Sequence, residues 1–413
     1  MSTKENLNSQ HRRRFIKFLA ASPLAMAAGA RGDSVWQSGY GSLHFTPLDF
    51  ADYLIQSADE AINSFEFEKV AARQIDPAHY GYVASGAGDG STVLANRQGY
   101  EQFYFRAHRL AGIANVDTSG SILGQDFSSP IMICPCGGMG AMHLEGETAV
   151  SRASSERGMI QMHSTMATYP IEAVTAGRQA PLWYQLYAIS GWDFAARMVE
   201  RAIQAGASAV LLTVDTPARG TPEFQNMMTR FDTRDCTECH GEVRSILHKP
   251  MISGAGITPE NQRSYVFSWE LVEQLKREFD VPILVKGIET AEDARKCIEH
   301  GADGLMVSNH GGRGLANGKA SILSLPDVVA EVNGEIPVIV DGGVRRGDEA
   351  LKALLLGADA VGIGRAYLYG LAAFGYEGAA KVMDLLNAEL RAAMKNLGIA
   401  SLQELSPEFI GRY

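Results

Sequence analysis

The chain is poor in cysteine, in net positive charge and in long apolar runs. Its 413 residues include only five cysteines, too few for a disulfide scaffold, and the odd count leaves at least one unpaired within the chain. The 37 basic and 47 acidic residues give a net charge of -10, which argues against nucleic acid or an acidic membrane surface as the main partner. No internal repeat of fixed period and no low-complexity tract is present. The 46% of hydrophobic residues nevertheless suffice for a large core.

The first thirty residues are expected to be a targeting segment and not part of the fold. Residues 12–17 place paired arginines before an aromatic, an aliphatic and a lysine residue, and 18–28 form a short, mildly apolar run. Residues 28–30 offer a small-x-small cleavage site, so the segment resembles a twin-arginine export signal. The apolar run is too short for a stable bilayer anchor. We therefore expect a signal peptide at 1–30, a linker at 31–45 and periplasmic localisation; a basic amphipathic tail is the alternative.

From residue 130 onward, short apolar segments alternate with helical ones. Such Val- and Ile-rich strands are typical of a parallel sheet buried on both faces, and eight of them favour a (β/α)8 TIM barrel. Strands are predicted at 131–134, 160–163, 183–186, 209–214, 283–285, 305–307, 338–340 and 360–363. Helices are predicted at 145–157, 171–176, 194–204, 269–279, 291–300, 325–332 and 348–356.

The barrel is expected to span 116–413, with a long loop at about 217–267. Residues 46–115 are expected to form an N-terminal helical segment, because 46–74 have helical spacing with Phe50, Tyr53, Leu54 and Ile62 on one side. A doubly wound open sheet is the alternative. It would require Gly-x-Gly-x-x-Gly after the first strand, which residues 135–140 do not supply.

Polar residues follow most of the predicted strands, at the end where barrels of this class carry their chemistry. They are Gln185, Tyr187, Thr213, Asp215, Lys286, His310, Arg313, Asp341 and Arg365. His310 can move a proton near neutral pH, and Arg313 can hold a carboxylate or phosphate by two hydrogen bonds. A base beside a fixed cation suits proton abstraction next to an acid group; a capped strand end with solvated side chains is the alternative.

Two glycine-arginine turns predict an anion site after the last two strands. Residues 341–347 and 362–365 expose backbone N–H groups near the start of the next helix, where they can hold a dianion with Arg345 or Arg365. Tight turns with surface arginines are the alternative. Lys286 should point into the barrel mouth, where a buried ammonium needs a partner. That partner is either a flavin that becomes anionic on reduction or a neighbouring carboxylate.

Six ordered motifs resemble one family. They are Tyr82-x-Ala84-Ser85-Gly86, Gln185-Leu186-Tyr187, the run 212–217 (LTVDTP), the run 283–287 (ILVKG), the run 308–313 (SNHGGR) and the run 341–347 (DGGVRRG). From about residue 77 to the C-terminus the chain is similar to the FMN-dependent α-hydroxy-acid oxidases and dehydrogenases: glycolate oxidase, lactate oxidase, lactate dehydrogenase and mandelate dehydrogenase. The resemblance implies FMN-dependent oxidation of a lactate-like L-2-hydroxy acid to the 2-oxo acid.

The resemblance also implies a role for each site residue. His310 is the base, Asp215 orients it, Arg313 and Tyr82 bind the substrate carboxylate, and Tyr187 contacts the substrate oxygen. Lys286 stabilises reduced flavin. The other cofactor-binding residues expected from the resemblance are Ser164, Gln185, Thr213, Ser308, Asp341, Gly343, Arg345, Gly364 and Arg365. Oxygen or a redox carrier such as a cytochrome or quinone takes the electrons, and a homo-oligomer, a tetramer in many members, is expected.

The chain departs from the family pattern at three places. Many members carry a second substrate-facing arginine where this chain has Gly220-Thr221-Pro222, and some have tryptophan at the position of Met166. After Arg313 the family often has Gln-Leu-Asp, but here the run is Gly314-Leu315-Ala316. A smaller, adaptable methionine leaves room for a different substrate side chain.

The run Cys236-x-x-Cys239-His240 in the long loop resembles a c-type haem attachment site. A haem there would take electrons singly and make the protein a dehydrogenase, but a small disulfide loop and one half of a metal site stay open as alternatives. Two further functions also stay open. One is an FMN-barrel isomerase acting on a phosphorylated substrate, and the other is a catalytically inactive flavin- or haem-binding exported protein.

Overall fold

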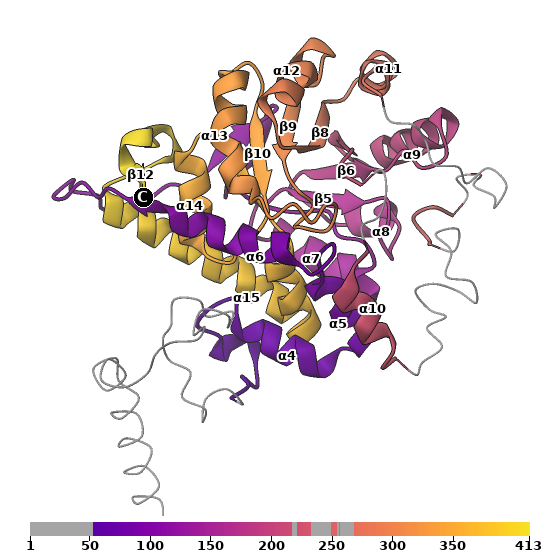
Figure 1. The fold of residues 1–413 in the computed structure, drawn as a ribbon, viewed down its shortest axis with the longest axis horizontal. Coiled ribbons are helices and arrows are strands. Elements are labelled where there is room, and N and C mark those ends of the chain that lie inside the picture. Colours follow the sequence, from indigo (N-terminus) through magenta and orange to yellow (C-terminus); the bar gives the residue numbers. More distant parts are fainter. Residues whose placement is uncertain (1–52, 217–220, 233–248, 254–255, 257–267) are drawn as a thin grey trace, which may run out of the picture. The chain divides into compact units, whose positions relative to one another are not determined.

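The computed structural model describes residues 53–216, 221–232, 249–253, 256 and 268–413 (Figure 1). The predicted signal peptide and linker, and the Cys236–His240 run, lie outside these residues and stay predictions. Residues Ser57–Tyr413 form one compact unit, so the N-terminal helices and the barrel are not separate bodies.

The predicted eight-stranded barrel is confirmed. Its strands are β4 (Ile131–Ile133), β5 (Gln161–Ser164), β6 (Leu182–Leu186), β7 (Ala209–Thr213), β8 (Ile283–Ile288), β9 (Gly304–Val307), β10 (Val338–Asp341) and β11 (Ala360–Ile363). They close in the order β10-β11-β4-β5-β6-β7-β8-β9, and all pairs are parallel. Nearly every strand residue is buried, as expected for strands covered on both faces.

The seven predicted helices are present with small shifts of their ends. They are α7 (Gly146–Ser155), α8 (Ile171–Thr175), α9 (Trp192–Gln204), α11 (Glu270–Glu278), α12 (Ala291–Glu299), α13 (Ser321–Val332) and α14 (Gly347–Leu355). The sequence did not predict α15 (Arg365–Leu397), which is kinked where Gly375 adopts φ 59°. Across the described residues, no helix has the combined length and apolarity needed to cross a membrane.

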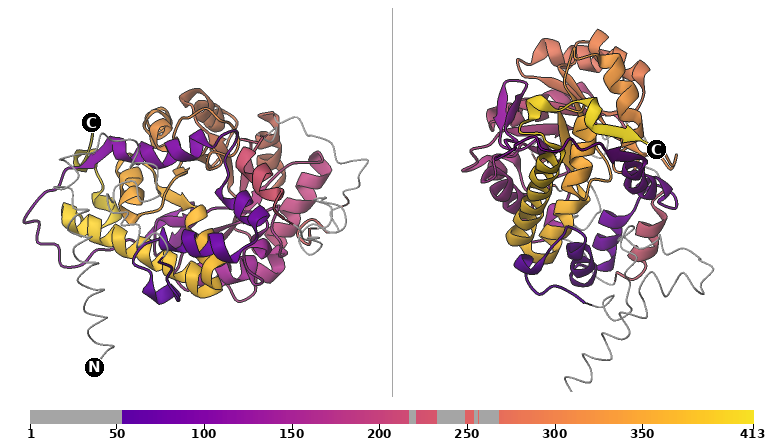
Figure 2. Two further views of the ribbon diagram at one scale, coloured as in Figure 1. Left: turned by 60° about the horizontal axis from the view of Figure 1, so that its bottom comes forward. Right: turned by 90° about the vertical axis from the view of Figure 1, so that its left-hand side faces the viewer.

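The N-terminal segment contains η2 (Ala58–Glu60), α4 (Glu66–Gln74), α5 (Pro77–Ala84), α6 (Ser91–Gln98), η3 (Gly99–Gln102) and β1 (Phe103–Phe105). Helix α4 packs along α15, and α5 packs against α10 (Glu223–Thr229) (Figure 1). Strand β12 (Ile410–Arg412) pairs with β1, which brings the C-terminus beside residue 103 (Figure 2). The N-terminal helices therefore cover the barrel's outer helices and approach its mouth.

In its described part, the helical interpretation of 46–74 is confirmed at 66–74 and wrong before residue 66, where only the short 3-10 helix η2 is present. The α-helix begins only at Glu66, and Ile62, expected on the helix face, is 75% exposed. Asn63 Oδ1 accepts the N–H of Phe65 at 2.9 Å, and Glu66 accepts the N–H of Ile62 at 2.8 Å. These side-chain bonds give the backbone an alternative to a continuous helix.

A short hairpin closes the N-terminal end of the barrel. Strands β2 (Gly120–Ile122) and β3 (Gln125–Phe127) place Ile122 and Phe127 in one apolar cluster with inward-facing strand residues. Trp183 in that cluster donates its Nε1–H to Gln125 Oε1 at 2.7 Å. Because this end is filled by apolar side chains, polar chemistry is confined to the other end.

Candidate active site

A distortion of β8 sets the centre of the site. The register between β8 and β9 shifts between Lys286 and Ile288, and Gly287 adopts φ 112°. A Cβ on Gly287 would lie 2.5 Å from Asp215 Cβ, so only glycine allows the loop after β7 to approach this closely. Lys286 consequently lies in the barrel mouth beside Asp215, and both are buried.

Asp215 links the predicted base to the buried lysine. Its Oδ1 lies 2.7 Å from His310 Nδ1, and its Oδ2 accepts a hydrogen bond from Lys286 Nζ at 3.0 Å. Lys286 also donates to Ser308 Oγ at 2.8 Å and lies 3.9 Å from Asp341 Oδ2. The side chain of His310 remains 22% exposed while that of Asp215 is 7% exposed. The imidazole of His310, the predicted base, is therefore accessible and its carboxylate partner is not.

Neighbouring charges determine the ionisation states of Asp215 and Lys286. Burial alone would raise the pKa of Asp215, but Lys286 and His310 lower it to about 2. Burial would likewise lower the pKa of Lys286, but the carboxylates of Asp215 and Asp341 raise it above its ordinary value. Asp215 is thus an anion and Lys286 a cation at neutral pH. An anionic Asp215 favours the imidazolium that His310 forms when it accepts a proton.

The loop that carries His310 is held in an uncommon conformation. His310 has φ 58°, and its N–H donates to Ser308 Oγ at 3.0 Å. Asn309 and Asn96 of α6 exchange two amide hydrogen bonds of 2.8 and 2.9 Å, and both side chains are buried. Asn309 Oδ1 also accepts the N–H of Gly312 at 3.0 Å. This network, which the sequence did not predict, stabilises the strained backbone at His310.

The residues expected to bind substrate lie on the same side of the mouth. His310 Nε2 is 3.3 Å from Tyr187 OH, and burial, then the charge of Asp215, raise the pKa of that phenol. Arg313 lies over the ring of Tyr82, 4.7 Å from its centroid, and donates to the carbonyl of Tyr82 and, at 3.1 Å, to that of Ser85. Direct contacts therefore join the six predicted catalytic residues in two groups: Tyr187, His310, Asp215 and Lys286 form one, and Arg313 and Tyr82 the other.

Comparison with known proteins agrees with this geometry. The family model described as FMN-dependent dehydrogenase matches residues 71–412. A peroxisomal (S)-2-hydroxyacid oxidase of Arabidopsis thaliana is 38% identical over 84% of this chain and 96% of the relative. An L-lactate oxidase of Lysinibacillus sphaericus is also 38% identical, over 82% of this chain and 90% of the relative.

Among solved structures, a soluble mutant of the membrane-associated (S)-mandelate dehydrogenase from Pseudomonas putida matches with a TM-score of 0.78 at 32% identity. The match covers 86% of this chain and 100% of that one. The chain belongs to the FMN-dependent dehydrogenase family. The resemblance inferred from the six motifs is thereby confirmed, and with it an FMN-dependent oxidoreductase on a TIM barrel.

Unpaired polar atoms at the mouth fit the FMN that this family uses. Ser164 donates to Gln185 Oε1 at 2.8 Å, which leaves Gln185 Nε2 buried without a partner among the described residues. Thr213 Oγ1 is in the same state, and both residues were predicted flavin contacts. Buried polar atoms are costly unless they are hydrogen-bonded. The carbonyl oxygens and nitrogens of a flavin ring would satisfy them.

The two arginines predicted to bind the FMN phosphate both have partners within the protein. Arg345 donates to Glu68 of α4 at 3.0 Å and lies over the rings of Phe65 and Tyr369. Arg365 donates to the carbonyls of Val83, Ser85 and Gly311 at 2.7 to 2.8 Å. Their part in phosphate binding stays a prediction, and these guanidinium groups have other partners here.

The backbone of the phosphate side fits the prediction better. Gly343 has φ 83° and lies against Asn96, so a Cβ there would collide with the main chain. Gly364 precedes α15, whose first N–H groups have no partner within the helix. An anion held here would be bound mainly by N–H groups.

The departures from the family pattern have structural counterparts. Met166 packs against Gly137, where a Cβ would lie 2.7 Å from Met166 Cβ, and Tyr82 OH donates to Gly137 O at 3.2 Å. Pro222 pairs with Gly88 in an isolated bridge, so the Thr221–Pro222 turn lies close to α5. Leu315 is 66% exposed.

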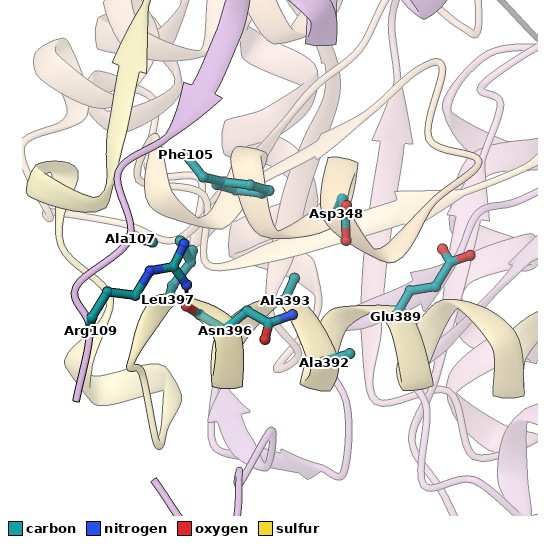
Figure 3. A pocket seen from close by; sticks show the side chains of 9 residues that line it. All are labelled: Phe105, Ala107, Arg109, Asp348, Glu389, Ala392, Ala393, Asn396 and Leu397. Carbon is teal, nitrogen blue, oxygen red and sulfur yellow. Dashed lines mark hydrogen bonds between the residues drawn. The ribbon is translucent and has the colours of Figure 1, made fainter. Parts of the chain in front are cut away.

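A separate groove lies away from these residues (Figure 3). It is lined by Phe105, Ala107 and Arg109 after β1, by Asp348 of α14 and by five residues of the second half of α15. None of the predicted site residues lines it. The groove has no part in the chemistry of the barrel mouth.

Proposed function

We propose that this enzyme oxidises an (S)-2-hydroxy acid to the corresponding 2-oxo acid. The relatives named above are a 2-hydroxyacid oxidase, a lactate oxidase and a mandelate dehydrogenase. The observation that carries the proposal is the contact of 2.7 Å between His310 Nδ1 and the anionic Asp215. This contact places a proton on Nδ1 and leaves Nε2, beside Tyr187 OH, as the base.

The side chains divide the work as follows. Arg313 and Tyr82 bind the substrate carboxylate, which places the α-carbon and its hydroxyl near His310 and Tyr187. His310 Nε2 takes a proton from the substrate, and Asp215 stabilises the resulting imidazolium by its charge. FMN, when bound, would supply the acceptor for the two electrons and the second hydrogen that leave the substrate. Lys286 keeps a positive charge at the mouth, where it offsets negative charge that develops nearby.

The test is His310→Ala. We expect substrate-dependent flavin bleaching under anaerobic conditions to slow by about 1,000-fold, because a general base contributes typically 10²–10⁴ in rate. FMN content should stay at the wild-type level. His300→Ala is the matched control, since His300 also pairs with a carboxylate, Glu273, at 2.7 Å but lies at the surface. Fast bleaching by the His310 variant would refute the assignment of the base.

The isomerase alternative is less well supported. It requires basic groups at the mouth for a substrate phosphate in addition to those for the cofactor. Arg345 and Arg365 are engaged with Glu68 and with backbone carbonyls. Formation of a 2-oxo acid with consumption of an electron acceptor would exclude the isomerase and also the inactive binding protein.

We also propose that the protein is exported by the twin-arginine route to the periplasm, functions as a homo-oligomer and passes its electrons to oxygen or to a redox carrier. The sequence supports a haem at Cys236, Cys239 and His240, which would pass the electrons to such a carrier. A visible spectrum of protein purified from its own compartment tests it. Sharp reduced-haem bands beside the flavin band support haem, and a flavin band alone rejects it.

A further inference from the structure

The rim of the barrel after β8 carries a carboxylate that the proposed chemistry does not use. Glu289 directly follows β8 and comes three residues after Lys286. Its Oε1 is enclosed and has no hydrogen-bond partner among the described residues. Burial raises the pKa of Glu289, Lys319 lowers it, and the nearby charges of Asp215 and Asp341 raise it further. Glu289 therefore faces the mouth and not the outer surface.

A second carboxylate oxygen in the mouth is also buried and lacks a hydrogen-bond partner among the described residues. Asp341 Oδ1, at the end of β10, is buried without a partner in the described part of the chain. Lys286, a buried cation in the mouth, donates to Asp215 and Ser308 and leaves Glu289 Oε1 and Asp341 Oδ1 without a donor. Two enclosed acceptors without donors are costly, and each calls for a ligand that brings O–H or N–H groups.

The ligand chemistry that fits is a neutral, donor-rich chain. Carboxylate oxygens only accept hydrogen bonds at neutral pH, and they repel an anion. Phosphate is therefore excluded as their direct partner. The FMN of the proposed function joins its ring to its phosphate through a ribityl chain with hydroxyl groups, which are donors without charge.

We infer that Glu289 is a further cofactor-binding residue that, together with Asp341, accepts hydrogen bonds from the ribityl hydroxyls of FMN. The inference rests on the proposed function only in taking FMN as the ligand. It assigns the two acceptors on β8 and β10 to the polyol, the unpaired Gln185 and Thr213 to the ring, and the backbone N–H groups around Gly343 and Gly364 to the phosphate.

The test measures flavin binding to the apoprotein by quenching of flavin fluorescence. Three probes separate the parts of the cofactor: FMN, riboflavin, which lacks the phosphate, and lumiflavin, which lacks the ribityl chain. For Glu289→Leu we expect FMN and riboflavin to bind about tenfold more weakly, because hydrogen bonds to charged groups contribute strongly. Lumiflavin binding should not change. Glu289→Gln, which keeps an acceptor oxygen, should show a smaller loss.

Controls make each result decisive. Glu292→Gln, at an exposed position in the first turn of α12, should bind all three probes like the wild type. Circular dichroism establishes that the Leu variant is folded, and the Gln variant serves if it is not. Unchanged riboflavin affinity in both variants, or an equal loss for lumiflavin, would overturn the inference. Failure of the wild-type apoprotein to bind FMN would instead overturn the proposed function.

Discussion

The charged residues predicted on the two sides of the barrel mouth have different kinds of partner. At the ends of β7, β8 and β9, Asp215 contacts Lys286 at 3.0 Å and His310 at 2.7 Å. At the ends of β10 and β11, Arg345 and Arg365 contact α4 and the segment around Ser85 instead. The first side is built from residues of neighbouring strands, and the second is completed by helices from the N-terminal segment.

The difference shows what a strand-end motif can and cannot specify. Neighbouring parallel strands bring their carboxyl ends to one rim, so an acid, a lysine and a histidine there meet almost by necessity. A long arginine side chain can instead reach any acceptor within its range. Glu68, Val83 and Ser85 lie far from Arg345 and Arg365 in sequence, and only the packed structure reveals them as partners.

The largest effect should come from Asp215→Asn on the acid–base side. The change removes the partner of His310 and leaves Lys286 without its closest counter-charge. We expect anaerobic flavin reduction to slow by about 100- to 1,000-fold and the free energy of unfolding to fall by about 3 kcal/mol, since breaking a buried ion pair costs that much. Stopped-flow absorbance and urea unfolding measure the two effects.

The pH dependence follows from the lowered pKa of Asp215. Because it is about 2 in the folded protein, the stabilisation is complete above about pH 4 and is lost as the pH falls toward 2. The Asn variant should lack this acid-sensitive part of its stability. Asp193→Asn, at an exposed position of α9, is the control. Identical acid unfolding of Asp215→Asn and wild type would contradict the buried pair.

Gly287→Ala tests whether the acid–base side depends on backbone geometry. Gly206→Ala is the matched control, because Gly206 has φ 100°, close to the 112° of Gly287, but has no atom within 4 Å of the added Cβ. Strain should therefore be similar in both variants, and only Gly287→Ala should displace Asp215. We expect its unfolding free energy to fall by about 2 kcal/mol more than that of the control. Equal losses in urea unfolding would mean that the close approach is unimportant.

The smallest effect should come from Arg345→Met on the phosphate side. Removing the guanidinium leaves Glu68 unpaired and deletes contacts to Phe65 and Tyr369, so we expect a stability loss of about 1 kcal/mol. Arg152→Met, which removes an exposed pair with Glu145 and a ring contact with Tyr376, is the control. The binding of FMN and the binding of riboflavin should be weakened equally. A loss of FMN affinity with riboflavin binding intact would instead confirm the predicted contact of Arg345 with the phosphate.

Much of the site could be predicted because its residues lie at strand ends. The eight strands were recognised from their apolar composition, and His310, Asp215 and Lys286 follow them directly. The Asn96–Asn309 pair could not be predicted, because Asn96 lies in the short helix α6, 213 residues from Asn309. Glu289 was also missed, since a glutamate after a strand is no signal until its oxygen is found to be enclosed.

The sequence by itself determined the barrel and the position of His310, the predicted base, at its rim, because burial on both faces and the two-residue strand period leave a parallel strand little choice of which groups reach the rim. Only the tertiary structure decided how the charges pair. Pairing depends on distances of about 3 Å between groups that the chain separates by many residues, and local sequence does not encode such distances. The bulge at Gly287 and the long helix α15 belong to this second class, since packing against Asp215 and α4 defines them.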